Sequence, residues 1–284
     1  MAKPTYKELL DAGVHFGHLK RKWNPKMSKY IFAMRKGIHI IDLNRTLDEM
    51  DRAGRAMKAL ARSGKKILFV ATKKQARDVV TEVARDCNMP FVTDRWLGGM
   101  LTNWATIRRS VRKMQQIDGM LADQSLSSIT KKERLMLARE REKLERVLGG
   151  ISELNRVPTA IFMVDITHEH IALSEATRLG LRTFAMVDTN SDPTTVDFPI
   201  PANDDASKAI EIVVRYLGEW VKAGYEEREQ QKADQAAEQQ KREQEDALAA
   251  EEAAQAQAAQ TQAAAEVPAP EAAPSAGADE AAAQ

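Results

Sequence analysis

The sequence is poor in cysteine and lacks long apolar runs. Cys87 is the single cysteine among 284 residues, so no internal disulfide can form, which fits a reducing cytosol. Val79, Val80 and Val83 precede it on a predicted helix, so we expect Cys87 to be buried rather than nucleophilic. No stretch approaches about 18 apolar residues, and the first residues carry no apolar signal region. We therefore expect neither a membrane span nor a secretory signal.

The motifs of common nucleotide-binding enzymes are also absent. The strand-like run at residues 66–71 is followed by Thr-Lys-Lys-Gln, not by the glycine fingerprint of dinucleotide-binding folds. The glycine-rich phosphate loop that ends in Gly-Lys-Ser/Thr does not occur, and no serine or cysteine stands in a recognisable nucleophile context. We predict a protein that is not an enzyme. An enzyme that binds a nucleotide or phosphorylated substrate at a sheet edge stays an alternative.

The net charge of +1 hides a strong asymmetry along the chain. Residues 226–284 hold 14 acidic and 4 basic residues, which leaves 27 acidic and 38 basic residues in the first 225. A basic body favours a polyanionic partner, first of all nucleic acid. The acidic segment is rich in Ala, Gln and Glu and has almost no large apolar residue, so we predict that residues 226–284 are disordered, with at most a transient helix near their start.

Apolar runs that alternate with helical patterns predict the fold. The runs at residues 66–71, 158–164 and 182–187 are typical of buried strands, and the segments between them repeat apolar residues at helical spacing. This alternation predicts an α/β fold with a Rossmann-like, mostly parallel sheet flanked by helices. Residues 189–202 predict a proline-rich loop, and Thr5, Thr72 and Thr130 each begin a predicted capping box at a helix start.

A different pattern interrupts this alternation at residues 105–148. Two long helical stretches surround a polar turn at residues 123–128, and each carries a narrow apolar stripe. The segment holds 11 basic and 6 acidic residues. We predict an inserted antiparallel coiled-coil hairpin, an α/β core formed by residues 1–104 and 149–225, and a tail at residues 226–284.

Two segments are candidates for RNA contact. Residues 19–30 combine cations with Trp23 and Tyr30, which predicts an extended loop that neutralises phosphates and stacks on bases. Residues 95–104 place a Gly98-Gly99 pair between two tryptophans, which predicts a rigid joint at the base of the hairpin. The alternative for residues 19–30 is a solvated loop that does not bind RNA. The alternative for residues 95–104 is a tight, packed corner between domains with no RNA contact. The predicted RNA-binding residues are Lys20, Arg21, Lys22, Trp23, Lys26, Lys29, Arg35, Lys36, Arg95, Arg108, Arg109 and Arg112.

A single divalent metal ion is conceivable at the carboxyl edge of the predicted sheet. Asp188 ends a strand and Asp204-Asp205 open a helix, and these positions meet at one edge of a doubly wound sheet. His18 would complete a ligand set with His and carboxylate chemistry. The alternative is that the aspartates cap helices, the histidine bonds locally and no cofactor is bound.

A series of specific motifs runs in order along most of the chain. They are residues 9–18 (LLDAGVHFGH), 23–27 (WNPKM), 66–70 (KILFV), 95–104 (RWLGGMLTNW), 149–151 (GGI), 168–172 (HEHIA), 187–193 (VDTNSDP) and 200–206 (IPANDDA). With these motifs the sequence resembles the bacterial ribosomal protein S2 family of the small subunit. The resemblance covers almost all of residues 5–225, with Leu181-Arg182 and Ala202 as local departures.

The resemblance implies a cytoplasmic, non-catalytic ribosomal protein with a Rossmann-like core and an inserted coiled coil. It implies binding to 16S rRNA between the head and body of the small subunit, beside other small-subunit proteins. It also implies a docking place for the mRNA-binding ribosomal protein S1 and support of translation initiation. A pure protein-docking scaffold that uses the hairpin as its binding face is a further alternative.

Overall fold

The computed structural model describes residues 3–122 and 130–265, with side-chain burial up to residue 243. The chain divides into two units, Met1–Gln230 and Gln231–Gln284. All strands of the described residues lie in the first unit. No helix among the described residues combines the length and apolarity needed to cross a membrane.

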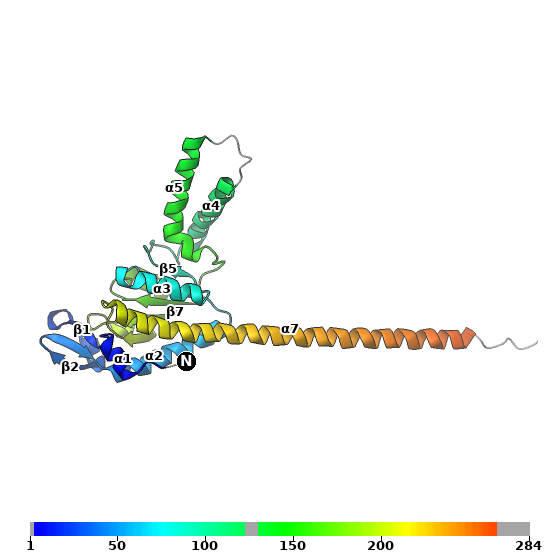
Figure 1. Cartoon of the computed structure of the whole chain (residues 1–284), viewed down its shortest axis with the longest axis horizontal. Coiled ribbons are helices and arrows are strands. Elements are labelled where there is room, and N and C mark those ends of the chain that lie inside the picture. The colour runs from blue at the N-terminus through cyan, green and yellow to red at the C-terminus, as the bar shows by residue number, and fades with distance from the viewer. Residues whose placement is uncertain (1–2, 123–129, 266–284) are drawn as a thin grey trace, which may run out of the picture. The chain divides into compact units, whose positions relative to one another are not determined.

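A five-stranded sheet forms the centre of the first unit (Figure 1). Its strands run parallel in the order β5-β4-β6-β7-β8, which confirms the predicted α/β class. Every residue of β4 and β6 is buried, as expected for parallel strands covered on both faces. The strands are β4 (Ile67–Val70), β5 (Phe91–Val92), β6 (Ala160–Val164), β7 (Arg182–Val187) and β8 (Phe198–Pro201).

Two apolar layers cover the sheet because successive strand residues point to opposite faces. Phe69, Phe162 and Phe184 belong to one layer, to which helices α2, α3 and α7 contribute. Leu68 and Met163 belong to the other layer, which includes residues of α4 and α6. These helices are α2 (Leu43–Arg62), α3 (Lys74–Asp86), α4 (Trp104–Ala122), α6 (His170–Arg178) and α7 (Ser207–Ala265).

A small antiparallel sheet precedes the five-stranded sheet along the chain. After helix α1 (Tyr6–Asp11), strands β1 (Phe16–Leu19), β2 (Ile31–Arg35) and β3 (Ile38–Ile41) pair in the order β1-β3-β2. Lys36 and Gly37 connect β2 to β3, and both have the positive φ that a tight two-residue hairpin turn requires.

The segment between β1 and β2 is more compact than the predicted extended loop. It forms two short 3-10 helices, η1 (Lys20–Lys22) and η2 (Pro25–Tyr30). Met27 and Tyr30 are buried, so the expectation that Tyr30 stacks on RNA is wrong. These two side chains pack against the apolar layer beneath the segment. Their burial stabilises the compact conformation relative to an extended loop in which they would be exposed.

The inserted hairpin consists of α4 and α5 (Lys131–Leu148), which contact each other along their lengths. Ile107, Val111, Met114 and Ile117 form the buried stripe of α4. Arg141 stands in the stripe of α5 and bonds to Asp118 across the hairpin, which explains how a charged residue fits there. The capping box at Thr130 is present, and the predicted polar turn lies outside the described residues.

Two local predictions are wrong. The predicted loop at residues 189–202 contains β8, an edge strand; Ala202 N donates to Val187 O of β7 (3.2 Å). Prolines lack the N–H group and are tolerated at a sheet edge, which is why a proline-rich sequence hides this strand. Thr72 does not cap α3: its N–H and hydroxyl groups donate to the Glu169 carboxylate (2.7 and 2.6 Å), and the helix begins later, at Lys74.

Helix α7 continues beyond its predicted end. Ile210, Val213 and Leu217 form the predicted buried stripe near its start. From residue 226 the sequence predicts a disordered tail with a transient helix near its start, and the backbone is helical to Ala265. Ala, Gln, Glu and Lys are strong helix formers, and the next proline is Pro268. All side chains described at 229–243 are exposed, so this helix gains little from packing.

Candidate nucleic-acid interface and carboxylate cluster

The short helix η1 presents three neighbouring cations. Lys20 N donates to Gly37 O (2.9 Å), and Asn24 N donates to Thr189 O (2.7 Å), so the backbone is fastened on both sides of η1. Lys20, Arg21 and Lys22 are exposed, and none has an ion-pair partner within the described part of the chain. The sequence therefore places three uncompensated charges on a fixed backbone.

Other residues of the predicted loop have partners within the protein. Lys26 Nζ lies 2.6 Å from Asp192 Oδ2, and this hydrogen bond is the main reason that the pKa of Asp192 falls to about 2. The ring of Trp23 is half-buried, with its centroid 5.0 Å from that of His39. Lys29 Nζ lies 4.6 Å above the ring of Tyr30. These contacts make Lys26, Lys29 and Trp23 less available than the cations of η1.

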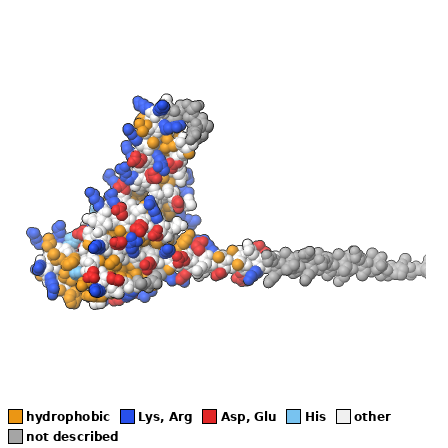
Figure 2. Space-filling model, in the orientation of Figure 1, with side chains coloured by type: hydrophobic (Ala, Val, Ile, Leu, Met, Phe, Trp, Pro, Cys, Tyr) orange, Lys and Arg blue, Asp and Glu red, His pale blue; other side chains and the backbone are white. Residues whose placement is uncertain are grey.

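The base of the hairpin carries the second group of predicted cations. Arg95, Arg109 and Arg112 are exposed, whereas Arg108 is half-buried and donates from Nη1 to Asn155 O (2.6 Å). Figure 2 shows Lys and Arg side chains along the hairpin and around β1 and β2. Arg35 and Lys36 are exposed at the β2–β3 turn.

Both groups of cations are anchored to the same apolar layer. Met27 and Tyr30 from η2 and Ile107 and Val111 from α4 all belong to the layer on one face of the five-stranded sheet. The structure therefore carries η1 and the hairpin base on one side of the sheet, although they are more than 80 residues apart in sequence.

The Gly98-Gly99 segment is occupied by a carboxylate of the protein itself. Gly99 N donates to Glu175 Oε1 (2.7 Å), and Leu101 N and Thr102 N donate to Oε2 (2.9 and 3.0 Å). Trp96 Nε1 and the Thr102 hydroxyl group also donate to Glu175 (both 3.1 Å). The loop thus has the donors of an anion-binding nest, and α6 supplies the anion.

These hydrogen bonds act on the protonation of Glu175. Burial raises its pKa, but bonds from Thr102, Leu101, Trp96 and Gly99 lower it, and the resulting pKa lies below the usual value for glutamate. The carboxylate is therefore ionised near neutral pH. The sequence could not show this partner, because residue 175 is more than 70 residues from the loop.

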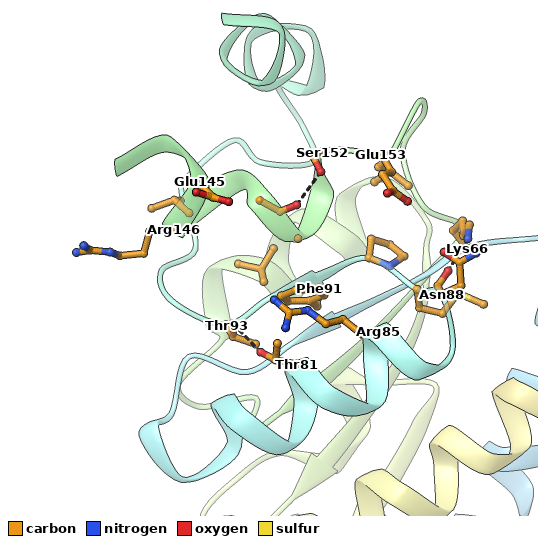
Figure 3. Close-up of a pocket in the computed structure, with 17 residues that line it drawn as sticks. Lys66, Thr81, Arg85, Asn88, Phe91, Thr93, Glu145, Arg146, Ser152 and Glu153 are labelled. Atoms are coloured by element: carbon orange, nitrogen blue, oxygen red, sulfur yellow. Dashed lines mark hydrogen bonds between the residues drawn. The ribbon is translucent and has the colours of Figure 1, made fainter. Parts of the chain in front are cut away.

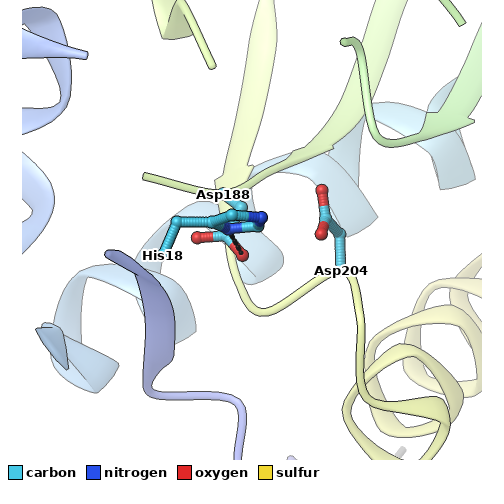
Figure 4. A group of neighbouring side chains, drawn as sticks. All are labelled: His18, Asp188 and Asp204. Atoms are coloured by element: carbon cyan, nitrogen blue, oxygen red, sulfur yellow. Dashed lines mark hydrogen bonds and ion pairs between the residues drawn. The ribbon is translucent and has the colours of Figure 1, made fainter. Parts of the chain in front are cut away.

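The predicted metal ligands come together at the carboxyl edge of the sheet (Figure 4). His18 Nδ1 lies 2.9 Å from Asp188 Oδ2, and His18 Nε2 lies 3.5 Å from Asp205 Oδ2. One ligand atom each of His18, Asp188 and Asp204 lies within 4.8 Å of the other two. Asp188 and Asp204 are buried, His18 is half-buried and Asp205 faces solvent.

Two further residues, which the sequence analysis missed, complete this carboxylate cluster. Lys73 Nζ lies 2.8 Å from Asp165 Oδ2, 2.9 Å from Asp204 Oδ1 and 3.1 Å from Asp205 Oδ1. Asp165 directly follows β6, as Asp188 follows β7, and Lys73 is the third residue after the end of β4. Their positions at strand ends were the available signal, because the ends of parallel strands share one edge.

The environment shifts the titration of Asp204 and His18. Burial and the charges of Asp165 and Asp188 raise the pKa of Asp204 to about 7, although Lys73 opposes this shift. The hydrogen bond to Asp188 raises the pKa of His18 against the effect of burial. Neither carboxylate oxygen of Asp204 has a partner in hydrogen-bonding geometry, despite the short distance to Lys73.

The cluster can hold a cation but is a poor site for a phosphate. Four carboxylates surround one lysine and one histidine, so an added anion would be repelled, whereas a divalent cation would meet oxygen and imidazole ligands. The structure also supports part of the alternative: Asp188 Oδ1 accepts from Thr189 N (2.5 Å), and His18 bonds locally. Asn203 Oδ1, not Asp204, accepts from Asp205 N (3.0 Å) ahead of α7.

Comparisons with known proteins match most of the chain. The family model described as "Ribosomal protein S2" matches residues 9–224. The small ribosomal subunit protein uS2 of Cytophaga hutchinsonii is 60% identical over 232 residues, which cover 82% of this chain and 91% of that protein. Those of Porphyromonas gingivalis and Bacteroides fragilis are each 53% identical; the alignments cover 82% and 84% of this chain and 83% and 85% of those proteins.

Proposed function

The chain belongs to the ribosomal protein S2 family, and we propose that it binds 16S rRNA as a structural constituent of the small ribosomal subunit. Family membership makes it a ribosomal protein, hence part of the cytoplasmic translation machinery. The position between head and body, and the support of translation initiation, belong to the proposal. A non-catalytic role agrees with the family and with the absence of enzyme motifs from the sequence.

The observation that carries the RNA-binding proposal is the exposed η1 triplet. Lys20, Arg21 and Lys22 have no carboxylate partner in the described parts of the chain, so each keeps a full charge for a phosphate. Cations that neutralise phosphates release condensed counterions, and this release drives binding. Arg35, Lys36, Arg95, Arg109 and Arg112 have the same exposed character and would extend the contact.

The test is binding of 16S rRNA to the full chain at increasing salt. We expect the Lys20→Ala, Arg21→Ala, Lys22→Ala triple variant to bind more weakly. The slope of log affinity against log salt concentration should decrease in magnitude by roughly 2–3, because each lost phosphate contact reduces it by about 0.7–0.9. A matched control changes Lys74, Lys208 and Lys222 to Ala; these are exposed lysines of α3 and α7 on the layer opposite η1. Equal affinity and slope in wild type and the η1 variant would reject this assignment.

An apolar surface on the small sheet supports protein docking as well. Phe32 is 77% exposed, and Phe16, Leu19 and Met34 are each about half-exposed. Such side chains beside basic residues suit neighbouring small-subunit proteins, including the mRNA-binding ribosomal protein S1. Purified S1 should bind the wild-type chain and bind less to a Phe32→Ala, Met34→Ala variant, with Leu135→Ala, Met136→Ala on the hairpin as control. Unchanged S1 binding would remove S1 from this surface.

A single divalent cation at the carboxylate cluster is a second proposal. His18, Asp188 and Asp204 would hold it, and Asp205 would contribute from the rim. The buried oxygens of Asp204, which lack hydrogen-bond partners, favour this occupant. Elemental analysis of purified wild type and Asp188→Ala protein tests it. Metal in the wild-type protein but not in the Asp188→Ala protein would support the site. A metal-free wild-type protein would show that Lys73 and His18 are the only cations of the carboxylate cluster.

The alternative of a nucleotide-binding enzyme receives little support. The edge of the sheet where such folds bind phosphates is lined by Asp165, Asp188 and Asp204, and the glycine-rich loop already contains Glu175. A rise of the melting temperature of the wild-type chain on addition of nucleotides would revive this alternative.

A further inference from the structure

A large cavity lies between the hairpin base and the edge of the five-stranded sheet that β5 forms. It measures about 670 Å³ and is bordered by α3, β5, the end of α5 and the 3-10 helix η3 (Gly149–Ile151) (Figure 3). Nothing in the functions described above uses it. Its walls combine apolar side chains with charged and hydroxyl-bearing ones, which suits a ligand that has both apolar and polar parts.

An aromatic ring and an arginine lie at the centre of this cavity. The Arg85 guanidinium carbon lies 5.4 Å from the centroid of the Phe91 ring, and Figure 3 shows Arg85 close to Phe91 inside the site. A Cβ atom on Gly150 would come within 2.2 Å of Phe91 O and 2.8 Å of a ring carbon, so η3 holds this ring in place. Arg85 is exposed and has no ion-pair partner in the described residues.

Polar groups on the walls can accept and donate hydrogen bonds. The Thr81 hydroxyl group donates a hydrogen bond to the Thr93 hydroxyl oxygen (3.2 Å), and Ser152 Oγ donates to Gly149 O (2.8 Å). Asn88 and Lys66 lie on another side of the site, where Lys66 Nζ donates to Asn88 O (2.5 Å). These donors and acceptors line the same cavity as the Arg85–Phe91 pair and can bond to polar groups of a ligand.

The charge of the site favours an anionic ligand. Burial lowers the pKa of Lys66, and Glu153 opposes this shift while Arg228 adds to it, so its ammonium group gains from an added negative charge. Glu145 is compensated by Arg141, with Arg141 Nη1 2.6 Å from Glu145 Oε2. The cations Lys66 and Arg85 are therefore opposed mainly by Glu153, which is exposed.

We propose that this cavity binds one nucleotide of RNA that is unstacked from its neighbours. The base would stack on the guanidinium plane of Arg85, Thr93 and Asn88 would contact its edge, and Lys66 would pair with the phosphate. Bases of single-stranded or bulged RNA commonly stack on aromatic rings and arginine planes. The inference rests on the RNA-binding function proposed above and adds a site for a single base to it.

The test uses the full chain with 16S rRNA and three variants. Arg85→Ala and Arg85→Lys should each weaken binding roughly fivefold or more, because stacking of one base has an effect of that size or larger. Arg85→Lys is decisive, since it keeps the charge and removes the planar surface. Arg55→Lys on α2, an exposed arginine that does not line the cavity, is the matched control and should bind as wild type does. Melting temperatures of all variants exclude unfolding as the cause.

Photo-crosslinking locates the contact independently of affinity. We expect one crosslinked nucleotide on the peptide that contains Phe91, and its loss in Arg85→Ala. If wild type binds RNA but crosslinks elsewhere, and Arg85→Lys binds with full affinity, the nucleotide site is wrong while the RNA-binding proposal stands. A wild-type chain that does not bind RNA would reject both. Adenosine or uridine monophosphate binding as tightly as RNA would overturn the assignment to RNA and indicate a free nucleotide as the ligand.

Discussion

The two charged regions of this protein are built in opposite ways. The cations of η1 and the hairpin base are mostly exposed and lack ion-pair partners in the described residues, whereas the carboxylates at the sheet edge are mostly buried and surround Lys73. The exposed group gains little from its own protein and keeps its charge for another molecule. The buried group is held by its mutual contacts and acts first on the stability of the core.

This contrast shows where a Rossmann-like fold can carry an RNA-binding function. The positions that usually bind phosphates, the carboxyl edge and a glycine-rich loop, are filled here by Asp204 with its neighbours and by Glu175. The exposed cations lie instead on additions to the core: the small sheet with η1, and the hairpin. The additions therefore provide the surface that we propose for RNA.

The largest effect should come from Glu175, because its loss leaves several buried donors without an acceptor. We expect Glu175→Ala to lower the free energy of unfolding by about 3–5 kcal/mol, since each unsatisfied buried donor costs about 1–3 kcal/mol and the loop can relax only in part. Urea denaturation measures this loss. Glu142→Ala, an exposed carboxylate of α5, should change stability by less than about 0.5 kcal/mol. Equal stability of both variants would show that the loop does not depend on its internal anion.

Two adjacent lysines allow a direct comparison of a buried charge with an exposed one. Lys73→Ala should lower the free energy of unfolding by about 2–3 kcal/mol, because removal of one partner leaves buried carboxylates uncompensated. Lys74→Ala removes an exposed lysine at the next position and should be neutral to within about 0.5 kcal/mol. Thermal and urea unfolding give both numbers. If Lys73→Ala is as stable as Lys74→Ala, Lys73 does not hold the carboxylate cluster together.

The pH dependence of Asp204 gives a smaller effect with a defined sign. The pKa of Asp204 is raised in the folded protein, so the folded state binds the proton more tightly, and stability falls as pH rises from the unfolded value toward about 7. Asp204→Asn removes this titration. The melting temperature of the variant minus that of the wild type should therefore increase between pH 5 and pH 8. The underlying change in the free energy of unfolding is about 1.4 kcal/mol for each unit by which the pKa is raised. A constant difference across this range would contradict the raised pKa.

The smallest effect should distinguish a paired cation from an unpaired one. Lys22 has no ion-pair partner within the described chain, whereas Lys26 is paired with Asp192. Lys22→Ala should reduce the salt slope of RNA binding by about 0.7–0.9, the loss expected for one phosphate contact. Lys26→Ala should change it by clearly less. An equal reduction would mean that RNA displaces Asp192 and that the paired and exposed cations behave alike.

The sequence predicted the fold well where local patterns carry the information. The apolar runs at 66–71 and 158–164, and the paired stripes of the hairpin, correspond to β4, β6, α4 and α5. Strand β8 was missed because Pro199 and Pro201 oppose strand formation everywhere except at a sheet edge, and edge position is a property of the whole sheet. The helical stretch from residue 226 to Ala265 was predicted only as a transient helix near the start of a disordered tail, because composition predicts weak packing but does not exclude local helix formation.

The candidate sites also contain some features that local sequence patterns predict and others that only the tertiary structure shows. The end of a strand and the start of a helix placed Asp188, Asp204 and Asp205 at one predicted edge, with His18 as a conceivable fourth ligand. The structure brings these side chains together. Lys73 was assigned instead to a capping box, because Thr-Lys-Lys-Gln has the local form of one. Its role depends on α3 beginning later and on carboxylates far along the chain, which no local pattern contains.

The sequence by itself determined the buried strands and the long helices, the basic body, the cations of η1 and the family to which the chain belongs. These features follow from side-chain chemistry and from periods of two and about 3.6 residues. The tertiary structure decided which charges are cancelled. It placed Glu175 inside the glycine-rich loop, Lys73 among the aspartates and Asp192 beside Lys26. Electrostatic energy depends on distance and burial, and only the folded chain sets both.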